Sequence, residues 1–199
     1  MVLVQLQKHS MRASNMSELE VVNVSGTINF QQRIALKPLA GSLAQRAEIN
    51  RVCYNPSELH LIHSWFFDND TYVAFYKNGI CAITGVDSLD KFYQVSSAVG
   101  VIIEEIVDLE IEIAVTITNI VSTAEIKHPP SLEIIAVELG LEQIEYEPEQ
   151  FPGLIYRDGE SVILIFANGK IVCTGFTDLN MIQSAIDDVT DQIENLEVS

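Results

Sequence analysis

The chain has 199 residues, 48% of them hydrophobic, and a formal net charge of -17. This length suffices for one large domain or two fused small ones. The acidic balance excludes a protein that coats nucleic acid without specificity, because such proteins are basic. It leaves open a DNA partner whose groove is deformed against a few cations and an apolar surface.

The start of the chain, residues 1–17, lacks a basic segment followed by a long apolar core, so it does not resemble a signal peptide. We expect a loose N-terminal tail there. No stretch reaches the roughly 18 uninterrupted apolar residues of a transmembrane helix, and we expect no membrane association. The three cysteines form no CxxC pair, which favours reduced, buried thiols in an intracellular, cytoplasmic protein.

The next part of the chain begins with a strand-like run around Asn23. A helix is expected over residues 38–46, with Pro38 where a helix can start. About four strands follow as a meander, in which Asn78-Gly79 between apolar strand formers predicts a type I′ hairpin. A second helix is expected over residues 88–107.

The same order then returns in the second part of the chain. A strand-like run surrounds Asn119, helices are expected over 130–141 and 178–196, and Asn168-Gly169 predicts a second hairpin. A Tyr-X-Pro corner stands in each part. Landmarks in one order, offset by about 90 residues, predict a duplicated half-domain. We place a first repeat at residues 18–108 and a second repeat, with an acidic C-terminal tail, at 109–199.

The strand over residues 162–166 is apolar on both faces. The hairpin turns require an antiparallel sheet, and four helices of the expected lengths cover only one face of about ten strands. The other face would be open and apolar, which usually marks a binding surface. An obligate dimer interface is the equal alternative. A pseudo-symmetric molecule also suits a ligand with approximate two-fold symmetry, such as duplex DNA.

Residues 147–157 and 164–175, continued by 118–122, strongly resemble the second repeat of the TATA-box-binding protein family, archaeal type. The resemblance covers roughly residues 18–196. It implies an α+β fold, a pseudo-two-fold saddle. A curved antiparallel sheet of about ten strands would place its concave face on the minor groove and carry four helices on its convex face.

The resemblance also implies residue roles. Asn23 and Asn119 would donate to base acceptors near the pseudo-two-fold axis, and Phe151 and Phe166 would part-unstack a base step. Ordinary core packing is the alternative for these two phenylalanines. The implied DNA-contacting residues are Asn23, Thr84, Leu59, Tyr76, Asn119, Val121, Phe151, Arg157, Leu164, Phe166, Lys170, Val172 and Thr174.

The first repeat departs from the family pattern on this same face. Leu59 and Tyr76 take the places of the wedge phenylalanines, and burying the tyrosine hydroxyl without a partner would cost about 1 to 3 kcal/mol. The phosphate-contacting positions hold Trp65 and Ile80, and three further positions also differ, namely Glu58, Ser25 and Ala82. Only Arg157 and Lys170 match the basic contacts, so the salt dependence should be shallow, on the order of two phosphates.

The resemblance implies a partner site at Glu147, Glu149 and Gln150, where the family meets transcription factor B and, through it, RNA polymerase. Two functions remain open. One is a general transcription initiation factor or specialised paralogue, nucleoid-associated, that bends TATA-like DNA. The other is an adaptor that binds transcription factor B with weak or no DNA binding of its own. A homodimer through the concave face is the expected DNA-free alternative.

We expect no enzyme, metal site or cofactor. The four histidines form no metal-spaced set with the cysteines, and no Gly-rich phosphate loop or nucleophile elbow is present.

Overall fold

The computed structural model describes residues 18–57, 60–67, 70–107, 113–127, 129, 131–138, 143–159 and 161–196. The predicted N-terminal tail lies outside these residues. The first half, residues 18–107, holds β1 (Glu20–Asn29), α1 (Leu36–Leu43), β2 (Ile49–Cys53), β3 (Leu61–Phe66), β4 (Tyr72–Tyr76), β5 (Ile80–Val86) and α2 (Leu89–Val107). The second half, residues 113–196, holds β6 (Ala114–Glu125), α3 (Leu132–Glu138), β7 (Ile144–Glu145), β8 (Gly153–Asp158), β9 (Ser161–Phe166), β10 (Lys170–Phe176) and α4 (Leu179–Leu196).

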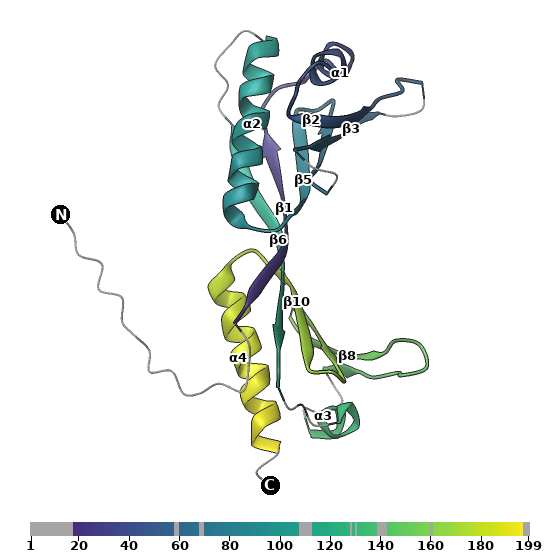
Figure 1. The fold of residues 1–199 in the computed structure, drawn as a ribbon, viewed down its shortest axis with the longest axis vertical. Helices are drawn as coiled ribbons and strands as arrows, with labels where there is room; N and C mark the ends of the chain where they lie inside the picture. Colours follow the sequence, from purple (N-terminus) through teal and green to yellow (C-terminus); the bar gives the residue numbers. More distant parts are fainter. Residues whose placement is uncertain are drawn as a thin grey trace, which may run out of the picture.

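All strands of the described residues form one sheet with the order β2-β3-β4-β5-β1-β6-β10-β9-β8-β7. Every neighbouring pair is antiparallel, and β1 pairs with β6 at the centre. The order reads the same from both ends when the two halves are exchanged. Figure 1 shows α2 and α4 along one side of a curved sheet, with α1 and α3 at its two ends. The predicted saddle of ten antiparallel strands and four helices is confirmed.

Alternation along the strands separates a core face from an open face. In β9 the side chains of Ser161, Ile163 and Ile165 are buried, whereas those between them are half-buried. The core face packs against the helices, as in α4, where Ile182, Ile186 and their neighbours one turn apart are buried. We call the opposite side, which Figure 1 shows curving away from α2 and α4, the open face.

The helix boundaries differ from the prediction where proline was used as a start signal. Helix α1 begins at Leu36, so Pro38 is its third residue, and it ends at Leu43 rather than at residue 46. A proline fits there because the first four N–H groups of a helix have no intrahelical partner. Pro130 and residues 139–141 lie outside the described residues, and α3 begins at Leu132. The two long helices begin within one residue of the prediction.

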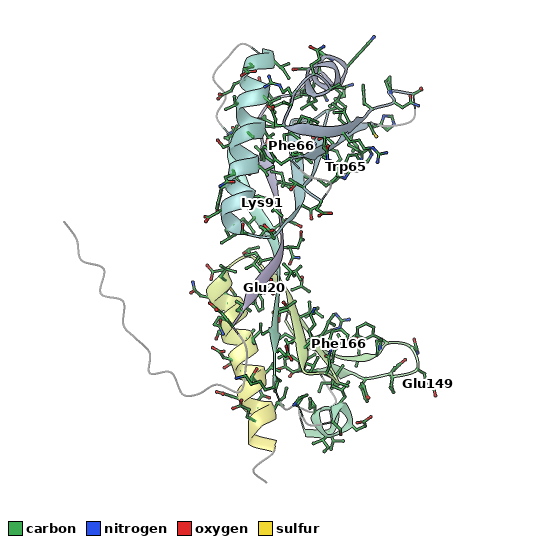
Figure 2. All side chains as sticks on the ribbon, viewed as in Figure 1. Glu20, Trp65, Phe66, Lys91, Glu149 and Phe166 are labelled. Atoms are coloured by element: carbon green, nitrogen blue, oxygen red, sulfur yellow. The ribbon has the colours of Figure 1, made fainter. Side chains whose placement is uncertain are left out.

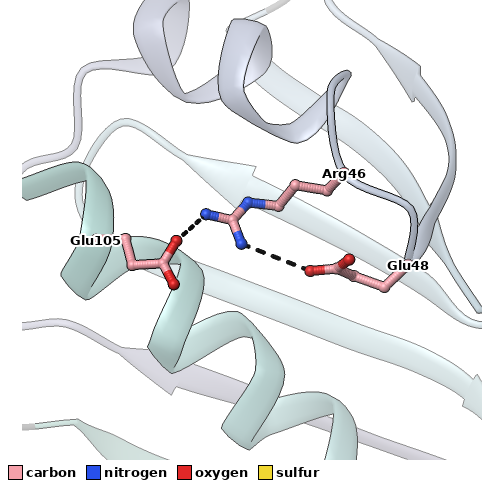
Figure 3. Close-up of polar contacts among 3 residues, drawn as sticks. All are labelled: Arg46, Glu48 and Glu105. Carbon is pink, nitrogen blue, oxygen red and sulfur yellow. Dashed lines mark hydrogen bonds and ion pairs between the residues drawn. The ribbon is translucent and has the colours of Figure 1, made fainter.

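One of the few cations serves the fold. The Arg46 guanidinium joins the loop after α1 to helix α2 (Figure 3). Its Nη2 forms an ion pair with Glu105 Oε2, and its Nη1 lies 3.6 Å from Glu48 Oε1. The hydrogen bond to Glu105 is the largest cause that raises the pKa of Arg46. Arg46 is therefore committed to carboxylates on the helix side of the sheet. None of the helices described is both long and apolar enough to cross a membrane.

Candidate nucleic-acid interface

Two asparagines at the centre of the open face hold the same pose. Asn23 Oδ1 accepts the Gly85 N–H at 2.8 Å, and Asn119 Oδ1 accepts the Gly175 N–H at 2.9 Å. A backbone N–H bonds only the amide oxygen, so these contacts fix which way each amide is turned. Thr174 also donates to Asn119 Oδ1, at 3.1 Å. Each amide NH₂ is thereby turned away from the glycine and is a donor for the open face.

The glycines that anchor the asparagines lie at irregularities of the sheet. Gly85 has a φ of 78° and Gly175 a φ of 99°, in the left-handed region that favours glycine. The register of β5 against β1 and of β10 against β6 shifts beside them. A Cβ on Gly85 would also lie 1.8 Å from the Asp70 carbonyl oxygen. The two Thr-Gly pairs thus place the central donors, a role that the sequence pattern alone did not reveal.

Apolar side chains of the second half line the open face beside Asn119. Val172 lies opposite Leu164 on β9 and opposite Thr123 on β6. Val121 on β6 lies opposite Asn23, and all of these side chains except Asn23 belong to the second half. The structure therefore brings Val121, Leu164, Val172 and Thr174 together, half-buried, on one face.

Phe151 and Phe166 lie edge to face at the end of this surface, with ring centroids 5.8 Å apart and an interplanar angle of 61°. Both are half-buried and outside the buried core. Gly153 lies opposite Phe166, and a Cβ there would come within 2.9 Å of Phe151 and 3.0 Å of Phe166. Gly153 makes room for the pair, and the sequence prediction missed it. The core-packing alternative for the two phenylalanines does not fit their exposure.

The corresponding end of the first half is built differently. Leu59, the expected counterpart of Phe151, lies outside the described residues. Tyr76 is 38% exposed and lies opposite Leu61, which stands where the second half has Gly153. The room that Gly153 leaves around the phenylalanine pair is thus taken by a leucine side chain.

The two expected phosphate-contacting cations both have carboxylates nearby. Arg157 Nε bonds Glu145 Oε1 at 3.0 Å, in a pair exposed on both sides. Lys170 lies opposite Glu125 and lines a surface hollow together with Glu18 and Glu20. These negative charges offset the attraction that either cation would exert on a phosphate.

A third cation reaches the open face from an unexpected strand. Trp65 occupies the place on β3 that Arg157 occupies on β8, and Arg51 lies opposite it on β2. The Arg51 guanidinium carbon is 4.9 Å from the centre of the Trp65 ring. Figure 2 shows Trp65 and Phe166 both on the side of the sheet away from α2 and α4. In the sequence, only the strand-like alternation of residues 51–53 could have indicated that Arg51 lies on one face of a strand.

Behind Trp65 stands a second aromatic contact. Tyr72 meets the Trp65 ring edge-on, with centroids 5.4 Å apart, and its hydroxyl lies 2.6 Å from His63 Nδ1. Burial is the largest cause that raises the Tyr72 pKa, followed by the charge of Tyr76. Tyr72 therefore stays neutral near pH 7, and the first half presents an aromatic surface with one stacked guanidinium.

Comparison with known proteins identifies the family. The model of a family described as transcription factor TFIID, or TATA-binding protein, matches residues 18–106 and 114–196. The chain belongs to the TATA-binding protein family. It is 34% identical to TATA-box-binding protein B of Halobacterium salinarum over 184 residues, which covers 89% of this chain and 94% of that protein. It is 33% identical to TATA-box-binding protein 2 of Haloferax volcanii, with the same coverage.

A solved structure supports the same assignment. The fold matches Methanococcus jannaschii TBP with a TM-score of 0.73 and 29% identity, covering 90% of this chain and 99% of that chain. The family is one of transcription factors, and among the described residues no group of three or more histidine, cysteine or acidic side chains is placed to hold a metal ion.

The acidic loop of this TATA-binding protein family member lies between β7 and β8. Glu147, Glu149 and Gln150 are all exposed, and the Glu147 carbonyl accepts the N–H groups of Gln150 at 2.9 Å and Phe151 at 3.0 Å. Figure 2 shows Glu149 at the tip of an arm that projects away from the helices. The loop thus holds its carboxylates in solvent, and Phe151 near its end belongs to the phenylalanine pair.

Proposed function

We propose that this chain is a transcription initiation factor that binds and bends TATA-like promoter DNA through the minor groove and recruits transcription factor B. The observation that carries this proposal is the matched pair of central amides. Asn23 and Asn119, each anchored by a glycine N–H, present donors at corresponding places on the two halves of one open face.

The chemistry of the minor groove fits these donors. A·T and T·A pairs expose only acceptors there, so a protein needs few donors and an apolar surface that follows the groove. The second half supplies that surface through Val121, Leu164 and Val172 beside Asn119. Shape complementarity rather than charge would then supply most of the contact, which suits a protein with a net charge of -17.

The phenylalanine pair supplies the means of bending. Phe151 and Phe166 are the half-buried aromatic rings at the end of the open face. Apolar side chains inserted between base pairs unstack a step at a cost of about a few kcal/mol, and the bent duplex then contacts more protein surface. The room around Gly153 lets both rings lie at one place.

The acidic loop is the proposed contact with transcription factor B. Glu147 and Glu149 are exposed on an arm beyond the DNA-facing surface, where their charge can meet a basic protein. Complementary charge speeds association and sets orientation more than it adds affinity. Through transcription factor B the chain would contact RNA polymerase indirectly. It would do so while bound to DNA in the nucleoid.

A second function has a specific observation in its favour. On the open face of the first half, Trp65 and Ile80 stand where the second half has Arg157 and Lys170, and both of those cations lie near carboxylates. A chain with so little positive charge could serve as an adaptor that binds transcription factor B and reaches DNA only within that complex. In its DNA-free state, a homodimer through the open face would cover the same apolar surface.

One titration separates these functions. A gel shift on a TATA duplex, with and without purified transcription factor B, should give a binary complex that the partner tightens and supershifts. Partner binding in solution without any binary complex would favour the adaptor. Absence of both complexes would overturn the proposal.

A further inference from the structure

Ser25 and Ala82 make the centre of the open face unlike in the two halves. Ser25 stands two residues after Asn23, where the second half has Val121 two residues after Asn119. Ala82 stands two residues before Thr84, where the second half has Val172. The asparagines and threonines are the same in both halves. At the centre of the open face, the halves therefore differ only in the side chains beside the central donors.

Ser25 belongs to a closed set of hydrogen bonds. Asn23 Nδ2 donates to Ser25 Oγ at 3.2 Å, and Ser25 Oγ lies 2.8 Å from Thr84 Oγ1. Thr84 Oγ1 donates to Asn23 Oδ1 at 3.4 Å, which uses its single proton. Ser25 must therefore donate to Thr84 while accepting from Asn23. A hydroxyl oxygen has two lone pairs, so one acceptor position remains on Ser25.

The second half has no acceptor at this place. Val121 presents methyl groups where Ser25 presents its hydroxyl. Val172 lies opposite Leu164, whereas Ala82 lies opposite Ala74. The open face of the first half is therefore more polar beside its central amide and has smaller side chains there.

This difference corresponds to the one feature that separates base pairs in the minor groove. A·T pairs expose acceptors only, whereas a G·C pair adds the guanine N2 amino group as a donor. Val121 offers that amino group no partner, and an unpaired buried donor is costly. Ser25 offers a lone pair, and Ala82 has a smaller side chain than the valine at the corresponding place in the second half.

We propose that Ser25 and Ala82 allow the first half to accept a G·C pair near its central amide, with Ser25 Oγ accepting a hydrogen bond from guanine N2. The second half requires A·T at the corresponding position. This inference rests on the proposed function, because it assumes that the open face lies on the minor groove. It assigns the chain promoter sites that are A·T-rich in one half and carry a G·C pair in the other.

The test uses duplexes that differ only in the minor-groove amino group. One G·C pair is moved through each position of an all-A·T site, and further duplexes carry G·C at both symmetry-related positions. Wild type should bind one single-G·C duplex within about threefold of the all-A·T duplex, because the saddle can turn its first half toward it. The double-G·C duplex should bind roughly tenfold or more weakly. Inosine in place of guanine removes the amino group and should restore binding to the double duplex.

Variants assign the effect to these side chains. Ser25→Val with Ala82→Val gives the first half the residues of the second, so the single-G·C duplex should lose roughly tenfold relative to the all-A·T duplex. Val121→Ser with Val172→Ala should reduce the penalty on the double duplex. Ser25→Ala keeps the space but removes the acceptor, and should lie between wild type and the double valine variant.

Two failures are distinguishable. If the all-A·T duplex binds but every single G·C pair costs wild type as much as it costs the double valine variant, this inference is wrong and the proposed function stands. If no duplex binds, even with transcription factor B present, the proposed function fails and this inference fails with it.

Discussion

The Arg51 guanidinium carbon lies 4.9 Å from the centre of the Trp65 ring, on the face of the sheet that the helices leave open. Trp65 fills the position that Arg157 fills in the second half. A guanidinium stacked on an aromatic face keeps its outer N–H groups free for another acceptor. The first half thus presents its cation from β2, whereas the second half presents Arg157 from β8.

Arg51→Ala should weaken DNA binding and lower the salt slope by close to one, since each neutralised phosphate contributes about that much. With Arg51, Arg157 and Lys170, the wild-type slope should correspond to about three phosphates, not the two expected from sequence. The measurement is the binding constant against salt concentration. Lys91→Ala is the control, because Lys91 lies on helix α2, 3.9 Å from Asp87. An unchanged slope for Arg51→Ala would remove Arg51 from the interface.

Ile80→Lys should tighten DNA binding several-fold at low salt and raise the salt slope by close to one. Ile80 is half-buried at the start of β5 and lies opposite the neutral Asn29, whereas its counterpart Lys170 lies opposite Glu125. The new lysine would therefore face a phosphate without a carboxylate on the neighbouring strand. Thermal unfolding should be little changed. Equal binding by variant and wild type would indicate that the first half stays off the duplex.

Much of the fold follows from local sequence. The Asn78-Gly79 and Asn168-Gly169 pairs predict two hairpins that the structure has, and the repeated order of landmarks predicts the symmetry of the sheet. The predicted turn type I′ is wrong, because only the glycine of each pair has a positive φ. The predicted helix boundaries are less accurate than the predicted helices, because a proline such as Pro38 fits at any position of the first turn of α1. Local sequence patterns do not predict which side chains come together where strands distant in the chain pair.

The parts of the site that sequence did not predict depend on such meetings. Arg51 and Trp65 become neighbours only through the register of β2 on β3. The bond from the Gly85 N–H to Asn23 Oδ1 and the contact between Ser25 and Thr84 depend on the pairing of β1 with β5, whose register shifts at this point. Comparison with the family pattern shows that Ser25 and Trp65 are unusual residues at their positions. Only the pairing of the strands shows what each side chain contacts.

Glu147→Lys combined with Glu149→Lys should break the ternary complex with transcription factor B. The reason is charge: both carboxylates are exposed on the arm between β7 and β8 and would become positive toward a basic partner. The binary DNA complex should be unchanged or slightly tighter. The two complexes are compared by gel shift.

The matched control for this reversal is Asp188→Lys with Asp191→Lys, two exposed residues of α4 that alter the net charge equally. If the control breaks the ternary complex as strongly, net charge rather than the loop is responsible. If the loop variant leaves partner binding intact, the partner site lies elsewhere.

Cys53 offers a test of the first half that needs no substitution. It lies half-buried opposite His63, on the open face, whereas Cys81 and Cys173 are buried. Burial raises the pKa of Cys173 to about 11 and that of Cys81 well above its ordinary value, so both thiols stay protonated and unreactive near pH 7. A neutral maleimide should therefore label Cys53 first, and saturating DNA should slow that labelling several-fold. Labelling at one rate with and without bound DNA would leave the first half out of the complex.

We propose above all that the open face bends DNA with its phenylalanine pair. The most direct measurement is energy transfer between dyes at the two ends of a TATA duplex, with wild type, Phe166→Ala and the control Tyr93→Ala. Tyr93 is an exposed aromatic ring on helix α2, on the opposite side of the sheet. We predict that wild type and Tyr93→Ala bring the ends together, and that Phe166→Ala, folded by circular dichroism, does not. Equal bending by Phe166→Ala and wild type would contradict the account.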